Sequence, residues 1–183
     1  MEYKTTGFEG LLVLEPKVFT DERGYFFESF KQQSLNEAFG GKLDFIQENE
    51  SKSLFGTLRG LHYQEGSYAQ TKLVRVTQGR VLDVVLDLRK SSDTFGKIYT
   101  VLLDDENKKQ LLIPKGFAHG FITLSNEAIF NYKVDEYYSP AHESGIKYDD
   151  SKLAIDWVLS KDKIKISDKD LNNPEFDFCK NYF

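Results

Sequence analysis

The segment Gly56–Gln64, with the sequence GTLRGLHYQ, carries the most unusual side chain of the chain. His62 lies among apolar neighbours in a strand-like sequence, and Arg59 precedes it by three residues. An imidazole titrates near neutral pH, so His62 is a candidate general base. The alternative is a buried histidine bonded to a backbone carbonyl. Strict alternation would place His62 on one face with Leu58 and Gly60, and Arg59 on the other face unless a bulge intervenes.

Two further residues could act together with such a base. Lys72 could supply a positive charge, and Tyr132 could donate a proton. Lys72 begins an otherwise apolar strand, where an ammonium is costly without an anionic partner, and Asp83 on the next expected strand could pair with it. Lys72 could stabilise negative charge on a substrate oxygen, or simply reach solvent at a strand end. Tyr132 shares an apolar face with Phe130 and Val134, where a phenol either packs or serves as a general acid.

A turn leading into a strand, Pro114–Phe121, contains His119 in a Pro-x-Gly-x-x-His spacing. Cupin-type barrels share this spacing, and their histidine often binds a metal ion. A metal site needs about three protein ligands. Gln64 stands where a metal-binding cupin commonly has a second histidine, so the sequence disfavours a metal site.

Near the end of the chain, Asp168-Lys169-Asp170 is a short charged run. Such a run usually forms a solvated turn. The alternative is that a buried aspartate from this segment orients His62 and stabilises its protonated form.

Short alternating or apolar segments separated by turn signals predict an all-β protein. The expected strands are Leu11–Leu14, Tyr25–Phe30, Gly56–Tyr63, Lys72–Gln78, Val81–Arg89, Ile98–Leu103, Gln110–Ile113, Ala118–Leu124 and Ala128–Val134. Two helices are expected, Gln32–Phe39 before a Gly-Gly stop and Lys152–Trp157. The length of 183 residues suits one domain, with a barrel core at about 45–140 and arms packed around it.

The composition excludes several classes of protein. The net charge is −5 and both signs are mixed along the chain, without the basic stripe of a nucleic-acid or membrane-surface binder. The polar start, Met1–Thr6, does not resemble a signal peptide, and no segment approaches the roughly 20 apolar residues that span a bilayer. Cys179 is the single cysteine, which favours a reduced, cytoplasmic setting.

Taken together and in order, these segments resemble the dTDP-4-dehydrorhamnose 3,5-epimerase family from about Phe8 to Asp170. The resemblance is carried by Glu15–Phe19, Asp21–Gly24, Gln47–Asn49, Leu58–Gln64, Lys72–Arg75, Phe95–Lys97, Pro114–Phe121 and Ser167–Asp170. It implies a cupin-like jelly-roll barrel with a few short helices in its N- and C-terminal arms. It also implies a homodimer without metal or organic cofactor that isomerises dTDP-4-keto-6-deoxyglucose on the route to dTDP-rhamnose.

The resemblance also implies roles for individual residues. His62 would be the base, Tyr132 the acid on the other face of the sugar, Asp170 the partner of His62, and Lys72 the cation near the C4 oxygen. Contacts to the nucleotide or sugar are expected from Arg23, Glu28, Gln47, Asn49, Arg59, His119, Tyr138, Glu143 and Lys169. The base is expected to stack on Tyr138 or Phe26, and the N-terminal arm to cross the dimer interface.

Three other functions remain open at the level of sequence. An epimerase acting at C3 alone would use the same residues. A metal-dependent cupin enzyme is a second alternative. A catalytically silent sugar-nucleotide-binding protein is the third, although binding alone needs neither His62 nor Tyr132.

Overall fold

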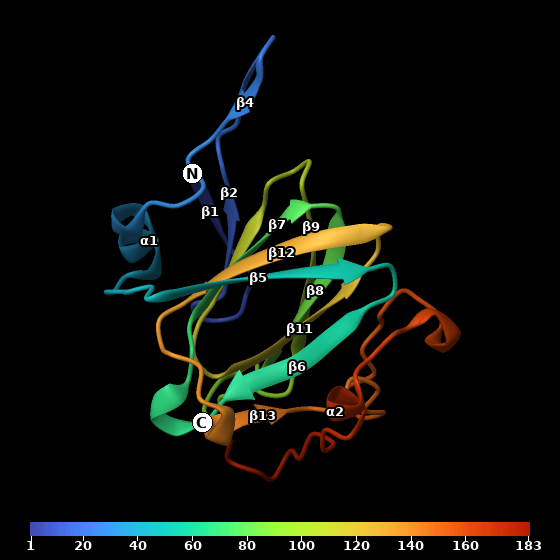
Figure 1. Cartoon of the computed structure of the whole chain (residues 1–183). Coiled ribbons are helices and arrows are strands. Elements are labelled where there is room, and N and C mark those ends of the chain that lie inside the picture. Colours follow the sequence, from blue (N-terminus) through green and yellow to red (C-terminus); the bar gives the residue numbers. More distant parts are fainter.

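The computed structural model describes all residues, 1–183, as two antiparallel β-sheets that face each other (Figure 1). The six-stranded sheet has the order β1 (Glu2–Thr5), β2 (Leu12–Glu15), β10 (Gln110–Ile113), β7 (Lys72–Gln78), β12 (Glu127–Val134) and β5 (Gln47–Leu54). The five-stranded sheet has the order β13 (Glu143–Gly145), β6 (Leu58–Gln64), β11 (Phe117–Thr123), β8 (Arg80–Asp87) and β9 (Ile98–Asp104). The prediction of an all-β protein is confirmed.

Three apolar clusters hold these layers together. The first lies between the sheets and includes Val74, Val85, Phe121 and Phe130. The second packs the C-terminal arm onto the outer face of the five-stranded sheet. The third packs helix α1 (Gln32–Phe39) onto the outer face of the six-stranded sheet. Each sheet is therefore covered on both faces over part of its area, as burial of apolar side chains requires.

Helix α1 has the predicted bounds. Its apolar residue Leu35 is buried, and Gly40 ends the helix in the left-handed region with φ of 73°. This conformation favours glycine, which explains why the Gly-Gly pair stops the helix there. The remaining helices are short: η1 (Gly66–Tyr68), η2 (Pro140–His142), η3 (Lys161–Lys163) and α2 (Asp168–Leu171). No helix has the length and apolar character needed to cross a membrane.

The predicted helix at Lys152–Trp157 is wrong. This segment starts with a turn and then has no regular secondary structure, with Ala154 in the left-handed region at φ of 47°. The buried Trp157 donates its indole N–H to the carbonyl of Tyr148 at 2.8 Å. Packing of the indole and its hydrogen bond therefore prevail over a weak helical preference.

The predicted strand at Tyr25–Phe30 is wrong over most of its length. Only β4 (Gly24–Phe26) forms, and it pairs with β3 (Phe19–Asp21) in a two-stranded hairpin. This hairpin projects away from the two sheets (Figure 1), and all residues of both strands are exposed. A strand needs a hydrogen-bonding neighbour, and beyond Phe26 this chain supplies none.

Strand β5 was missed because its sequence, QENESKSL, has no apolar alternation. It nevertheless pairs with β12 along its whole length, from Gln47 opposite Val134 to Leu54 opposite Glu127. A polar strand is stable here because one of its faces borders a polar cavity. Near the end of β5, the hydroxyl of Ser53 accepts a hydrogen bond of 3.0 Å from Nε of Arg59, which lines this cavity.

Candidate active site

An irregularity in strand β6 brings two of its polar side chains to the same side. His62 lies opposite His119 and Arg59 lies opposite Phe121, so the register shifts by one residue between the two pairs. Both His62 and Arg59 therefore line one cavity between the sheets. Leu58 belongs instead to the cluster under the C-terminal arm, so the expectation that it shares a face with His62 is wrong.

Gly60 in this irregular stretch makes room for the backbone of the neighbouring strand β11. A side chain at Gly60 would come within 2.6 Å of the Cα of Gly120 and of the carbonyl oxygen of His119. Its φ of 113° is also one that glycine adopts most easily. Strands β6 and β11 can approach this closely only with glycine at this position.

His62 is bonded to an aspartate that is 108 residues away in the sequence. Its Nε2 lies 2.6 Å from Oδ1 of the buried Asp170, whose Oδ2 accepts the backbone N–H of Gly60 at 3.3 Å. Asp170 lies on α2, and the hydroxyl of the N-cap residue Ser167 accepts the N–H of Asp170. Burial alone would raise the pKa of Asp170, but the hydrogen bonds from His62 and Gly60 outweigh it and lower this pKa. The carboxylate is therefore charged at neutral pH.

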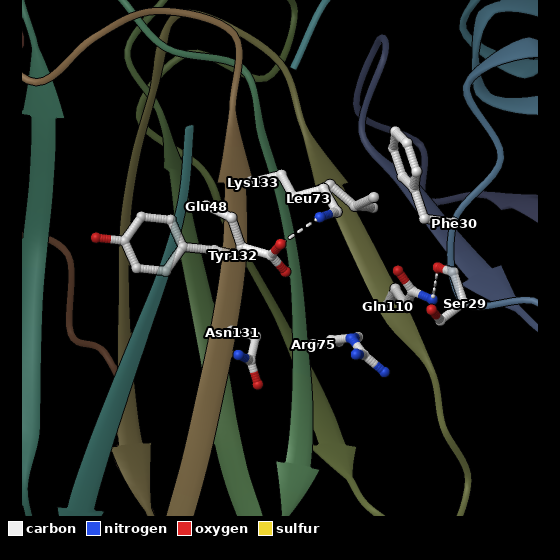
Figure 2. A pocket seen from close by; sticks show the side chains of 9 residues that line it. All are labelled: Ser29, Phe30, Glu48, Leu73, Arg75, Gln110, Asn131, Tyr132 and Lys133. Atoms are coloured by element: carbon white, nitrogen blue, oxygen red, sulfur yellow. Dashed lines mark hydrogen bonds and ion pairs between the residues drawn. The ribbon is translucent and has the colours of Figure 1, made fainter. Parts of the chain in front are cut away.

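Tyr132 faces His62 from the other sheet. Figure 2 shows its side chain pointing away from Asn131 and Lys133, its neighbours on β12, which lie on the outer face of the sheet. Burial raises the pKa of Tyr132 and the charge of Glu143 adds to this, against the opposing effects of Asn49 and Arg59. The phenol therefore keeps its proton at neutral pH.

Lys72 lines the same cavity from the start of β7. Burial lowers its pKa to about 8, and the negative charges of Asp83 and Glu143 oppose this change only in part. The expected ion pair between Lys72 and Asp83 is wrong. Asp83 is fully buried, and its Oδ2 lies 2.9 Å from Nε2 of His119. The ammonium of Lys72 is thus left without a carboxylate partner and is available to an anionic oxygen.

Three further predicted residues meet at the rim of the cavity. The carboxylate of Glu143 accepts the hydroxyl of Tyr138 at 2.5 Å and pairs with Nζ of Lys169 at 2.5 Å. The pKa of Glu143 is lowered, because the contacts with Lys169 and Tyr138 outweigh the effect of burial. Half of the Tyr138 surface remains exposed, so its ring is accessible to a ligand.

The cavity has a volume of about 340 Å³ and contains most of the predicted residues. It is lined by Arg59, His62, Lys72, His119, Tyr132, Lys169 and Asp170 among the predicted ones, and by Glu50, Ser51, Gly120, Phe121, Phe130 and Ser167, which sequence reasoning missed. Gln47 and Asn49 lie on β5 next to it and are hydrogen-bonded to each other. The alternation of small polar residues along β5 was the available signal for Ser51.

Two predicted residues lie outside the cavity of their own chain. Arg23 is exposed at the tip of the projecting hairpin, where its guanidinium contacts Asp21 at 2.6 Å. Glu28 is exposed on the segment between the hairpin and α1.

The side chains that could have formed a metal site are engaged elsewhere. His62 and His119 each contact an aspartate, and Nδ1 of His142 contacts the hydroxyl of Ser139 at 2.8 Å. Gln64 directs its amide to three backbone groups. No group of three or more His, Cys, Asp or Glu side chains is arranged to hold a metal ion.

The arrangement matches the needs of proton transfer next to a carbonyl. A histidine–aspartate pair and a protonated phenol face each other across a cavity that also holds an unpaired ammonium. Such a set can remove a proton from one face of a substrate, stabilise the resulting oxyanion, and return a proton to the other face.

Comparison with known proteins identifies relatives over nearly the whole chain. The model of the dTDP-4-dehydrorhamnose 3,5-epimerase family matches residues 5–177. The dTDP-4-dehydrorhamnose 3,5-epimerase of Shigella flexneri is 53% identical over 171 residues, which cover 93% of each chain.

Solved structures agree with this relationship. The crystal structure of dTDP-4-dehydrorhamnose 3,5-epimerase from Elizabethkingia anophelis superposes with a TM-score of 0.94 at 47% identity, covering 100% of this chain and 99% of that one. A Legionella pneumophila dTDP-6-deoxy-D-glucose-3,5-epimerase, solved with dTDP-4-keto-L-rhamnose, gives a TM-score of 0.91 at 46% identity, with coverage of 95% and 92%. The cupin-like jelly-roll prediction is confirmed by these neighbours.

Proposed function

The chain belongs to the dTDP-4-dehydrorhamnose 3,5-epimerase family, and we propose that it carries out this isomerisation with His62 as base and Tyr132 as acid. The reaction converts dTDP-4-keto-6-deoxyglucose to dTDP-4-keto-rhamnose. The observation that carries the assignment of roles is the placement of His62–Asp170 and Tyr132 on facing sheets of one cavity.

The chemistry follows from the ketone at C4 of the sugar. This ketone acidifies the protons at C3 and C5, because the electrons of either broken C–H bond can move onto the C4 oxygen as an enolate. Asp170 occupies Nε2 of His62, which leaves Nδ1 to take the proton. Lys72 stabilises the enolate oxygen, and Tyr132 delivers a proton to the opposite face of the same carbon. The configuration is inverted. His62 then releases its proton to water and Tyr132 takes one up, and repetition at the second carbon completes the isomerisation without redox change.

Recognition of the nucleotide is assigned to the rim. The ring of Tyr138 offers an exposed surface on which thymine stacks. The diphosphate is assigned to Arg59, His119 and Lys169, which supply positive charge or N–H donors inside or beside the cavity. Glu143 holds both Tyr138 and Lys169 before the substrate arrives.

We further propose a homodimer in which the β3–β4 hairpin of one subunit completes the cavity of its partner. Arg23 and Phe26 are expected to contact the nucleotide, yet both lie on a hairpin that projects away from its own sheets (Figure 1). Phe26 is 71% exposed, which is unusual for a phenylalanine in a folded chain. A second copy of the chain gives both side chains a place to bind.

The proposed setting is dTDP-rhamnose biosynthesis in the cytoplasm, as a step toward cell-wall polysaccharide. The only cysteine, Cys179, is free and exposed, which suits a reducing compartment.

The first test is proton NMR of dTDP-4-keto-6-deoxyglucose incubated with the protein in deuterated water without added metal. We expect deuterium at both C3 and C5. Deuterium at C3 alone would replace the proposal with the C3-only epimerase. Absence of deuterium at both carbons would overturn the proton-transfer chemistry, and recovery of turnover on addition of metal would favour the metal-dependent alternative.

A further inference from the structure

Gln64 ends strand β6 two residues after His62, and its side chain is buried. All of its bonds go to backbone outside the strand. Its Nε2 donates to the carbonyl oxygens of Tyr68 at 3.0 Å and Tyr137 at 3.3 Å. Its Oε1 accepts the N–H of Ser139 at 2.6 Å. A single amide thus joins the strand that carries His62 to η1 and to the segment that contains Tyr138.

Two of these bonds bracket Tyr138. One goes to the carbonyl of the residue before it and the other to the N–H of the residue after it. Tyr138 lies beyond the end of β12, in a segment without regular secondary structure. Upstream, the side chain of Gln70 bonds the carbonyl of Glu136 at 2.9 Å, but Gln64 alone holds both sides of Tyr138.

The ring of Tyr138 is fixed from a second direction through its hydroxyl. That hydroxyl bonds Glu143, and Glu143 is the residue paired with Gln64 in the β6–β13 register. The backbone and the hydroxyl of Tyr138 are therefore both tied to the end of one strand. The exposed ring is held in place although its segment takes part in no β-sheet hydrogen bonding.

We propose that Gln64 is a positioning residue that sets the place of the Tyr138 ring relative to His62 and so determines nucleotide affinity. The proposal rests on the proposed function, in which Tyr138 stacks on thymine. Because the bonds exist before the substrate binds, the loop does not have to be ordered at the moment of binding.

The chemistry of glutamine explains why this residue type stands here. The site needs two donors and one acceptor on a single planar group, which a primary amide supplies. A histidine would offer at most one donor together with one acceptor, and a glutamate would place negative charge against two carbonyl oxygens. The position that could have held a metal-binding histidine is used to hold a loop.

The test compares Gln64→Met and Gln64→Glu with the unchanged protein. The methionine variant keeps the volume and loses all three bonds, whereas the glutamate variant keeps the acceptor for Ser139 and loses both donors. Affinity for dTDP is measured by calorimetry, and kcat and KM are measured with the keto-sugar nucleotide. Gln78→Met serves as the matched control, because Gln78 is exposed at the far end of β7 and bonds only Glu127.

We expect Gln64→Met to weaken dTDP binding and raise KM by roughly tenfold, with kcat changed less than about threefold. Gln64→Glu should also weaken dTDP binding and raise KM. If the methionine variant fails to fold, the glutamate variant provides the test. Unchanged dTDP affinity in a folded Gln64 variant would overturn the proposal, as would an equal loss in the Gln78 control.

A double-variant cycle separates this inference from its premise. Tyr138→Ala alone should weaken dTDP binding, and adding Gln64→Met to it should cause little further loss, because Gln64 acts through Tyr138. A full additional loss in the double variant would overturn the positioning role. If Tyr138→Ala leaves dTDP affinity unchanged, the premise that thymine stacks on Tyr138 fails. The single Tyr138→Ala variant is enough to show this.

Discussion

Individual residues of the cavity owe their properties to their partners rather than to their type. His62 and His119 lie opposite each other on adjacent strands, and each contacts a buried aspartate. His62 alone faces Tyr132 across the cavity, and the aspartate that it contacts, Asp170, also accepts a backbone N–H. Lys72 differs from the surface lysines in that burial has lowered its pKa while leaving it unpaired. These differences are the basis for two predictions.

Substitution of His62, the proposed base, should remove the chemistry without removing the fold. We expect His62→Ala to lower kcat by about 10³-fold or more, since general base catalysis contributes on this order. Deuterium incorporation at C3 and C5 should fall in parallel, while circular dichroism stays unchanged. A variant that keeps a rate close to the original would show that the base is another residue.

The rate should also depend on pH through Lys72. Its pKa of about 8 means that the ammonium is present below this pH and lost above it, so kcat/KM should decline as pH rises through about 8. The raised pKa of Tyr132 keeps the phenol protonated in this range, so it does not contribute to the decline. Lys72→Arg should lower kcat/KM and move the decline to much higher pH. A decline at the original pH in the arginine variant would assign it to another group.

At the scale of elements, the projecting hairpin is the least explained part of an isolated chain. It has two strands, exposed aromatic residues and no contact that accounts for Arg23 beyond its neighbour Asp21. An isolated two-stranded hairpin is only marginally stable in water. A hairpin of this kind with the exposed Phe26 at its surface favours a role in the proposed homodimer.

Mixing of two inactive variants tests whether the hairpin serves the partner's cavity. In a dimer of one His62→Ala chain and one Arg23→Ala chain, one cavity would have both defects and the other would have neither. We expect mixed and reassociated subunits to recover about a quarter of the original activity, if the subunits assort at random. If the hairpin serves its own chain, mixing will restore nothing.

On the scale of the whole molecule, a buried carboxylate fixes the connection between β8 and β9. Asp87 is fully buried and accepts hydrogen bonds from Arg89, Ser92 and Thr94. The guanidinium of Arg89 also bonds the carbonyl of Glu9 and lies over the ring of Phe117. This cluster joins the N-terminal arm, the core and the loop that carries Phe95-Gly-Lys97.

Removal of this carboxylate should lower the stability of the whole fold. We expect Asp87→Ala to reduce the free energy of unfolding by about 3 kcal/mol near pH 7, because it leaves a partly buried guanidinium unpaired. Although burial opposes it, the net shift lowers the pKa of Asp87 below its ordinary value of 3.8. Its contribution is therefore present above the unfolded pKa and is lost as pH falls through the folded one.

Urea unfolding of both proteins at several pH values measures this effect. The difference between the original protein and the variant should keep its full size well above the ordinary pKa of 3.8 and shrink as the pH falls below that value. A difference that stays constant over this range would mean that packing, and not the charged carboxylate, is the cause.

The sequence by itself determined the elements whose apolar pattern is local. Helix Gln32–Phe39 and the strands Lys72–Gln78 and Gln110–Ile113 have their predicted bounds. The order and spacing of its motifs also predicted the family to which the chain belongs. Local patterns suffice for such features because a helix stop or an alternating strand is encoded within a few residues.

The tertiary structure decided the contacts between distant segments. Asp170 contacts His62, and Asp83 contacts His119 and not Lys72. The polar segment Gln47–Leu54 forms a strand. Sequence reasoning could not settle these, because a shift of one residue in strand register turns every side chain to the other face. One such shift in β6 is what brings Arg59 and His62 into the same cavity, and no local pattern in GTLRGLHYQ specifies it.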